Sequence, residues 1–213
     1  SEGVAASLVG KTLADAQALV SGVSADEVQS FVYDRDGRLV YTIDANNALE
    51  ETIFDAAGQA VEVRRYQLAV ANRAAIDAAL LAGNAFSDTI FRSDAGTFAL
   101  RPAQSVDGDQ RTRIVRDAAG RERFVLTRAR DQAGTRMVWL VTERRFDAAG
   151  RVLEDILHGT PITAATPPST VAAMEAAMLA TSASERRITQ YQYDAAGRLE
   201  HRTMLVDGVQ VVE

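Results

Sequence analysis

Three groups of residues in this chain are candidates for catalysis or ligand binding: two histidines, a repeated series of aspartates and a set of tyrosines. His158 and His201 are the only histidines, and neither lies in a motif with a nucleophile or a metal ligand. We expect His201 to be a structural histidine in a strand and His158 to be a surface residue in a loop. Gly-x-Ser-x-Gly, His-Glu-x-x-His and phosphate-binding glycine loops are absent from the sequence. The sequence therefore predicts a protein that is not an enzyme and uses no cofactor.

The aspartates recur in a tetrapeptide, Asp-x-x-Gly. It occurs at Asp34–Gly37, Asp55–Gly58, Asp117–Gly120, Asp131–Gly134, Asp147–Gly150 and Asp194–Gly197, with a degenerate copy at Asp44–Asn47. Calcium needs several oxygen ligands that converge on one point, and one aspartate per turn does not supply them. An aspartate at the first position of a turn instead accepts a hydrogen bond from the backbone two residues later. We therefore predict structural turns and no metal site.

Each tetrapeptide predicts a tight hairpin between two strands. Glycine at the fourth position adopts a positive φ and closes the hairpin through a bulge, and Asn47 is the replacement that best tolerates this conformation. In the strand after the first turn, Leu39, Tyr41 and Ile43 share one face. Repetition of such units predicts a mainly β fold, an antiparallel β-hairpin repeat array.

Three of these turns carry a resemblance to a known family. The patterns Tyr33-Asp34-x-x-Gly37-Arg38-Leu39, Phe146-Asp147-Ala-Ala-Gly150-Arg151-Val152 and Tyr193-Asp194-Ala-Ala-Gly197-Arg198-Leu199 resemble the YD repeat of RHS proteins. The resemblance covers residues 31–66, 111–157 and 189–203, is weaker at 84–110, and is absent from 8–22, 67–83 and 167–183. It implies long antiparallel strands that coil into a β-rod or β-shell on large secreted or cell-surface proteins. Some members of that family enclose a toxin, and others form surface structures, adhesive structures or cell–cell contacts.

Three alanine-rich segments interrupt the strand pattern and predict short helical insertions, at residues 13–20, 72–81 and 171–180. The third follows two prolines and is capped by Ser169 or Thr170. One face of this helix is expected to carry Val171, Met174, Met178 and Leu179. Each helix followed by a run of strands defines three units, at residues 1–70, 71–166 and 167–213, within one continuous array rather than independent domains.

Composition limits the class of protein. The chain has 213 residues, of which 47% are hydrophobic and 24% charged, as in a folded protein with a real core. A net charge of −6 argues against a nucleic-acid partner. The absence of cysteine excludes disulfides and cysteine-ligated metals, and no apolar run reaches the length of a membrane span. The chain opens with Ser-Glu-Gly rather than Met, so we expect a segment of a longer chain or a processed product.

Aromatic residues gather near the turns and leave two interpretations open. Tyrosines beside arginines can hold sugar rings, which gives a candidate glycan face of Tyr33, Tyr41, Tyr191 and Tyr193. The alternative is a cross-strand aromatic ladder that needs no ligand. Trp139, in the most apolar strand of the chain, is expected in the core rather than at a ligand site.

These observations lead to a functional hypothesis. We expect a structural repeat module of a large secreted or cell-surface bacterial protein that forms an extracellular scaffold, fibre or adhesin. Its expected partners are other copies or neighbouring repeats of the same protein, with surface glycans as a further candidate, and neither nucleic acid nor membrane insertion. Two alternatives stay open: a wall segment of a toxin-encapsulating RHS shell, and a glycan-binding module.

Overall fold

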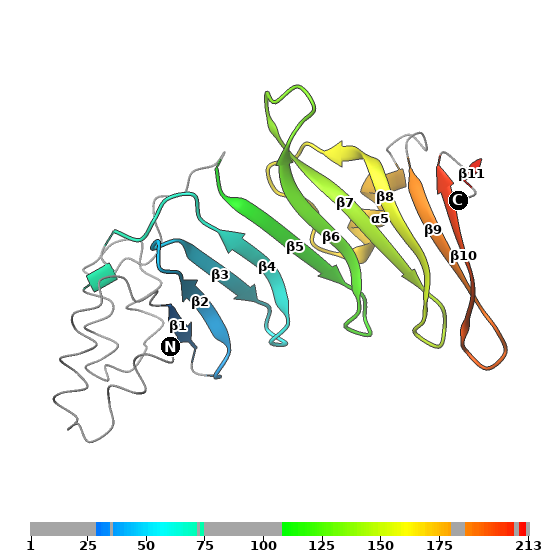
Figure 1. Ribbon diagram of the computed structural model, residues 1–213, viewed down its shortest axis with the longest axis horizontal. Coiled ribbons are helices and arrows are strands. Elements are labelled where there is room, and N and C mark those ends of the chain that lie inside the picture. Colours follow the sequence, from blue (N-terminus) through cyan, green and yellow to red (C-terminus); the bar gives the residue numbers. More distant parts are fainter. Residues whose placement is uncertain are drawn as a thin grey trace, which may run out of the picture.

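The computed structural model describes residues 29–34, 36–71, 73–74, 108–179, 186–206 and 209–211. These residues form one open sheet of eleven strands, in which every strand is antiparallel to its neighbours and sequence order equals spatial order (Figure 1). The predicted mainly β, antiparallel fold is confirmed. The strands are β1 (Ser30–Tyr33), β2 (Leu39–Ile43), β3 (Leu49–Phe54), β4 (Ala60–Arg65), β5 (Gln110–Arg116), β6 (Glu122–Arg130), β7 (Met137–Phe146), β8 (Val152–Ile162), β9 (Arg187–Tyr193), β10 (Leu199–Val206) and β11 (Val209–Val211).

Five Asp-x-x-Gly turns lie in a row at one end of the strands (Figure 1). We call this border of the sheet, formed by strand ends, the turn edge. They join β1 to β2, β3 to β4, β5 to β6, β7 to β8 and β9 to β10. Their glycines have φ between 75° and 83°, a region that side chains with a Cβ rarely adopt. The pairing register shifts beside each of these turns, because the third residue after the glycine is the extra residue of a bulge and has no partner across the hairpin.

The opposite edge of the sheet holds connections of varied length. Asp44–Asn47 joins β2 to β3, with Asn47 at a φ of 62°, and Asp131–Gly134 lies in the connection from β6 to β7. The connection from β4 to β5 spans residues 66–109, and that from β8 to β9 spans residues 163–186 and contains the helix α5 (Val171–Leu179). Long additions therefore occur only at this edge within the part of the chain that the structure describes.

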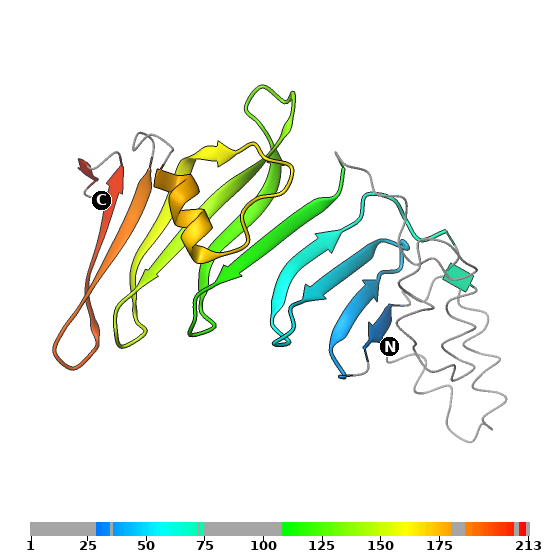
Figure 2. The same cartoon turned by 180° about the vertical axis from the view of Figure 1, so that it is seen from behind.

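Helix α5 covers one face of the sheet over β6 and β7 (Figure 2). Thr170 begins the helix, since its hydroxyl accepts a hydrogen bond from the backbone N–H of Ala173 at 3.3 Å. Met174 and Met178 are buried against Phe124 and Trp139 of the sheet, and Val171 packs beside them. Leu179 was expected on the same face, but it is 82% exposed, because one residue of helix turns it about 100° away from the buried Met178.

The apolar core is divided into two clusters. One lies in β1–β3 and the segment that follows β4, and the other lies between α5 and β5–β7, where Trp139 is buried as expected. Between the two clusters, the face of the sheet that α5 covers carries charged residues. Glu62 of β4 is 4% exposed there and binds Arg64, Arg111 and Arg113 at 2.9, 2.7 and 3.2 Å. A buried carboxylate of this kind is tolerated because several arginines neutralise it.

Of the three expected helices, the described residues contain one complete example, α5. The helix expected at residues 13–20 lies outside the described residues. The one expected at 72–81 does so too, apart from Arg73 and Ala74, which are helical. The division into units at residues 1–70, 71–166 and 167–213 stays a prediction, since no boundary interrupts the strand pairing.

The positive φ of the turn glycines leads to a test on Gly134, whose φ is 69° and around which an added Cβ meets nothing within 4 Å. We expect Gly134→Ala to lower the free energy of unfolding by about 1–2 kcal/mol, because the backbone conformation alone disfavours alanine. Gly134→Asn is expected to cost clearly less, as Asn47 tolerates the equivalent position. Urea unfolding measures both; equal losses for alanine and asparagine would contradict the explanation.

Candidate functional site

Each turn is held together by the carboxylate of its aspartate. In the turn between β7 and β8, the N–H of Gly150 donates to the carbonyl of Asp147 at 3.0 Å. The Oδ1 of Asp147 accepts from the N–H of Arg151 at 2.8 Å, and its Oδ2 accepts from the Nε of Arg151 at 2.6 Å. The backbone N–H of Arg151, and then its guanidinium, lower the pKa of Asp147. One carboxylate therefore binds both the backbone and the side chain of the residue after the glycine.

This arrangement repeats along the turn edge. The same carboxylate–guanidinium contact joins Asp34 to Arg38, Asp117 to Arg121 and Asp194 to Arg198 at 2.7–2.8 Å. Asp55 uses its carboxylate for the backbone alone, because Gln59 follows its glycine. At the opposite edge, Asp131 binds the N–H and hydroxyl of Thr135. The aspartates and glycines singled out from the sequence therefore all lie in turns that the aspartate carboxylate holds together, although the turn at Asp131 is one residue longer than those of the turn edge.

The arginine of a turn also contacts the next turn along the edge. Its guanidinium lies over the aromatic ring that ends the following odd-numbered strand, at a distance suited to a cation–π interaction. These pairs are Arg38 over Phe54 at 4.9 Å, Arg121 over Phe146 at 4.4 Å and Arg151 over Tyr193 at 4.7 Å. We call this series of aspartate, arginine and aromatic contacts the turn ladder. It connects hairpins that the backbone turns alone do not connect.

In the middle of the turn ladder, the arginine and aromatic positions are occupied by other residues, which contact each other's turns. Gln59 stands where the other turns have arginine, and Arg116 stands where the next turn would have its aromatic residue. Arg116 donates to the carbonyls of Gly120 and Ala60 at 3.3 and 3.4 Å. A Cβ added to Gly120 would lie 2.8 Å from Nε2 of Gln59, so these two turns also touch. An arginine at residue 59 would place two cations together, which the exchange avoids.

The two ends of the turn ladder present complementary halves. Tyr33, the last residue of β1, is 49% exposed, and no arginine among the described residues stacks on its ring. The Arg198 side chain is 82% exposed and holds only its own aspartate, with no aromatic ring over it in that part of the chain. One end therefore lacks a cation and the other lacks a ring.

The four tyrosines proposed as a glycan face do not share one surface. Tyr41 is fully buried, and its hydroxyl donates to Glu51 at 3.2 Å, so it cannot belong to an exposed face. Tyr193 lies under Arg151, and the Tyr191 hydroxyl donates to Asp155 at 3.0 Å. Including Tyr41 was wrong because its side of β2 packs into the first core cluster. The sequence analysis missed Tyr66, which also donates to Glu51, at 2.7 Å; burial, and then this hydrogen bond, raise the pKa of the Tyr66 hydroxyl.

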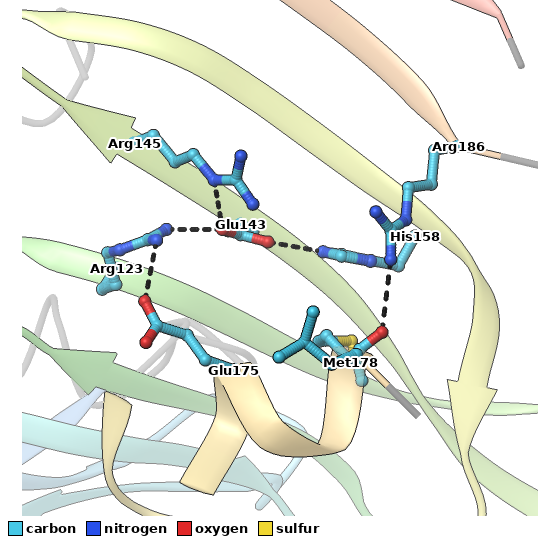
Figure 3. A pocket seen from close by; sticks show the side chains of 8 residues that line it. Arg123, Glu143, Arg145, His158, Glu175, Met178 and Arg186 are labelled. Carbon is cyan, nitrogen blue, oxygen red and sulfur yellow. Dashed lines mark hydrogen bonds and ion pairs between the residues drawn. The ribbon is translucent and has the colours of Figure 1, made fainter. Parts of the chain in front are cut away.

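A charged pocket of about 240 Å³ lies beside the C-terminal end of α5 (Figure 3). Its wall includes His158, which belongs to β8 and is 4% exposed. The expectation of a surface histidine in a loop was therefore wrong, and the exposed histidine is His201 in β10. The side chains lining the pocket are Arg123, Glu143, Arg145, His158, Glu175, Met178, Leu179 and Arg186.

Glu143 is the centre of this pocket's hydrogen bonds. Its Oε1 accepts from Arg123 at 2.9 Å and from Arg145 at 2.7 Å, and its Oε2 lies 2.8 Å from Nε2 of His158. Burial of the carboxyl raises its pKa, but the hydrogen bonds from His158, Arg145 and Arg123 outweigh burial and hold the pKa of Glu143 at about 2. The ionised carboxylate only accepts, so Nε2 of His158 carries the proton and donates.

Two further findings limit the chemistry of the described residues. No three His, Cys, Asp or Glu side chains among them are placed so that they could hold a metal ion. Their helical segments include none that is both long and apolar enough to cross a membrane.

The only signal in the sequence for the buried pocket is the two-residue spacing of Ile156 and His158, which places both on one side of β8.

Comparison with known proteins gives no assignment. No protein-family model matches the chain, and no curated protein is significantly similar to it. The resemblance to the YD repeat is therefore carried by the residues of the turns alone.

The turn ladder leads to a test with two matched arginines. Arg121 and Arg198 make the same contact with their own aspartates, but only Arg121 lies over a ring. We expect Arg121→Gln to lower the free energy of unfolding by about 0.5–1 kcal/mol more than Arg198→Gln. Urea unfolding of the two variants measures the difference, and the double variant with Phe146→Leu should remove most of it. Equal losses for the two arginines would contradict a stacking contribution.

The low pKa of Glu143 leads to a test of pH dependence. The folded-state pKa of about 2 lies below the ordinary value of 4.5, so this stabilisation is complete above about pH 4.5 and is lost as the pH falls toward 2. We expect a loss on the order of 3 kcal/mol, at about 1.4 kcal/mol per pKa unit. Denaturant unfolding between pH 6 and 2 measures it. Glu143→Gln should flatten the profile, whereas the exposed change Glu200→Gln should leave it as in the wild type; a profile unchanged in Glu143→Gln would contradict the assignment.

Proposed function

We propose that this protein is a structural repeat module that builds an extracellular scaffold by adding hairpins side by side. The observation that carries the proposal is the turn ladder, which repeats along the turn edge and ends with unmatched, complementary residues. An exposed arginine at one end and an exposed tyrosine at the other are suited to pair with each other when one module follows another. Such residues serve the extension of an array rather than the binding of a small substrate.

The strand edges support the same proposal. Strand β11 pairs with residues 204–206 of β10, and no described strand pairs with residues 199–203 on that side. All odd-numbered strands run in the same direction, so β1 of a following module has the direction needed to pair antiparallel with β10. If it followed the register of β2 with β3, Tyr33 would come opposite Arg198. Unpaired strand edges of this kind are sites of strand addition.

The resemblance to YD repeats supports the setting of this function. Proteins with such repeats are large and are secreted or displayed on the bacterial surface, and we propose the same location here. The partner is another copy of the chain or a neighbouring repeat of the same protein. In this function the module is a fibre, stalk or adhesin segment, and it does no catalysis.

Assembly tests the proposed function. We expect electron microscopy and sedimentation to show end-to-end particles that grow with protein concentration. Arg198→Gln should weaken this association roughly two- to fivefold, because one cation–π contact contributes about 0.5–1 kcal/mol. The matched control is Arg202→Gln, an exposed arginine of the same strand that lies outside the turn ladder. Single particles at every concentration, or equal effects of the two variants, would contradict self-assembly through these residues.

A further inference from the structure

The pocket beside α5 contains two buried nitrogen atoms that have no hydrogen-bond partner among the described residues. They are Nδ1 of His158 and Nε of Arg186. Buried polar atoms are nearly always hydrogen-bonded, so two in one small pocket require an explanation. Both side chains line the pocket, and Figure 3 draws the Arg186 guanidinium toward the end of the His158 ring that is opposite the Glu143 contact. Both residues line this one small pocket, so a ligand held there lies next to both side chains.

The charges of the pocket indicate which kind of ligand this is. Arg123 and Arg145 are neutralised by Glu143 and by the carboxylates of Glu175 and Glu154. Arg186 has no carboxylate partner within the described residues; its NH2 donates to the carbonyl of Met178 at 3.2 Å, at the end of α5. Arg186 is therefore the one arginine of the pocket lining that has no carboxylate partner among the described residues. A partly buried cation of this kind favours an anion.

We propose that this pocket binds a small oxyanion, a carboxylate or phosphate group, between Arg186 and His158. One oxygen accepts a hydrogen bond from Nε–H of Arg186, and the same or a second oxygen accepts from Nδ1 of His158 in its protonated form. Guanidinium and imidazolium groups are the usual partners of such oxygens. This function is separate from the assembly of the turn edge, since none of the pocket residues belongs to the turn ladder.

The size of the pocket limits the ligand. Its volume of about 240 Å³ is smaller than most pockets for drug-sized molecules, which occupy roughly 300–1,000 Å³. It nevertheless exceeds the share of one water molecule, about 30 Å³, so a single bridging water does not fill it. An acetate-sized or phosphate-sized group, together with a few waters, fits this space.

Binding of the anion is coupled to a proton on His158. With Nε2–H donating to Glu143, the neutral imidazole presents a lone pair at Nδ1, which repels an oxyanion. A proton at Nδ1 turns this atom into a donor, and the Glu143 carboxylate stabilises the resulting imidazolium. The other charged groups that face the ring are Arg145 of β7, Arg123 of β6, Glu175 of α5 and Arg186 ahead of β9. Because the bound form carries this additional proton, the anion binds more tightly as the pH falls.

Nitrogen-15 NMR of histidine-labelled protein tests this proposal, with acetate and inorganic phosphate as the probes. We expect either probe to shift the His158 resonances and to favour protonation of Nδ1, while the exposed His201 in the same spectrum does not respond. The affinity should rise at least about tenfold from pH 8 to pH 5.5, as expected for a charge-assisted hydrogen bond. The relative affinities of acetate and phosphate identify which oxyanion the site prefers.

Matched variants separate the site from general charge effects. Arg186→Gln should remove binding, whereas Arg187→Gln, an exposed neighbour with the same change in charge, should retain it. His158→Gln should leave weak binding without the pH dependence, and His201→Gln should behave as the wild type. Arg186→Lys, which keeps the charge but lacks Nε, should weaken binding and covers the case in which Arg186→Gln does not fold. The proposal is overturned if neither probe binds, if Arg187→Gln weakens binding as much as Arg186→Gln, or if glycerol binds there without pH dependence.

Discussion

A single carboxylate that binds the backbone and a guanidinium at once is the interaction on which this sheet depends. In the turn after β7, Asp147 fixes the backbone of Arg151 and also holds its side chain in one orientation. The oriented guanidinium then lies over the ring of Tyr193 in the following hairpin. Local turn chemistry is thereby converted into a contact between hairpins. Backbone pairing joins neighbouring hairpins along the strands, and at the turn edge the same side-chain geometry at Arg38 and Arg121 adds contacts between the turns themselves.

The apolar core is not continuous along the sheet, because buried charged residues separate its two clusters. Glu62 lies on the covered face among three arginines, between the two apolar clusters, and Glu143 lies beside α5 in a similar group. Burial of carboxylates is costly unless cations and hydrogen bonds compensate, and here they do. The covered face therefore alternates between apolar and ionic patches. This arrangement favours pairing in one register, since a shift of one residue would place each carboxylate on the wrong side of the sheet.

Local features of the fold were readable from the sequence, and features decided by distant packing were not. The glycine at each turn, and Asn47 in the degenerate copy, indicated positive φ directly, and antiparallel strands followed from the hairpins. The burial of His158 depends on a helix that packs beside it, and no residue near position 158 predicts that packing. The exchange of Gln59 and Arg116 is visible only when β4 and β5 are known to be neighbours, and residues 66–109 separate them in the chain. Leu179 was misplaced because it lies about 100° around the helix from the buried Met178.

The two long edges of the sheet face different evolutionary constraints. At the turn edge, every hairpin connection must keep one length, one aspartate and one backbone conformation, because the aromatic ring of the next hairpin contacts its arginine. At the other edge the connections between β4 and β5 and between β8 and β9 hold dozens of residues, including a complete helix, without disturbing the pairing of the strands they join. A lineage of such proteins can thus acquire new sequence at one edge only. Loops, helices or whole binding elements can be exchanged there while the array continues unchanged.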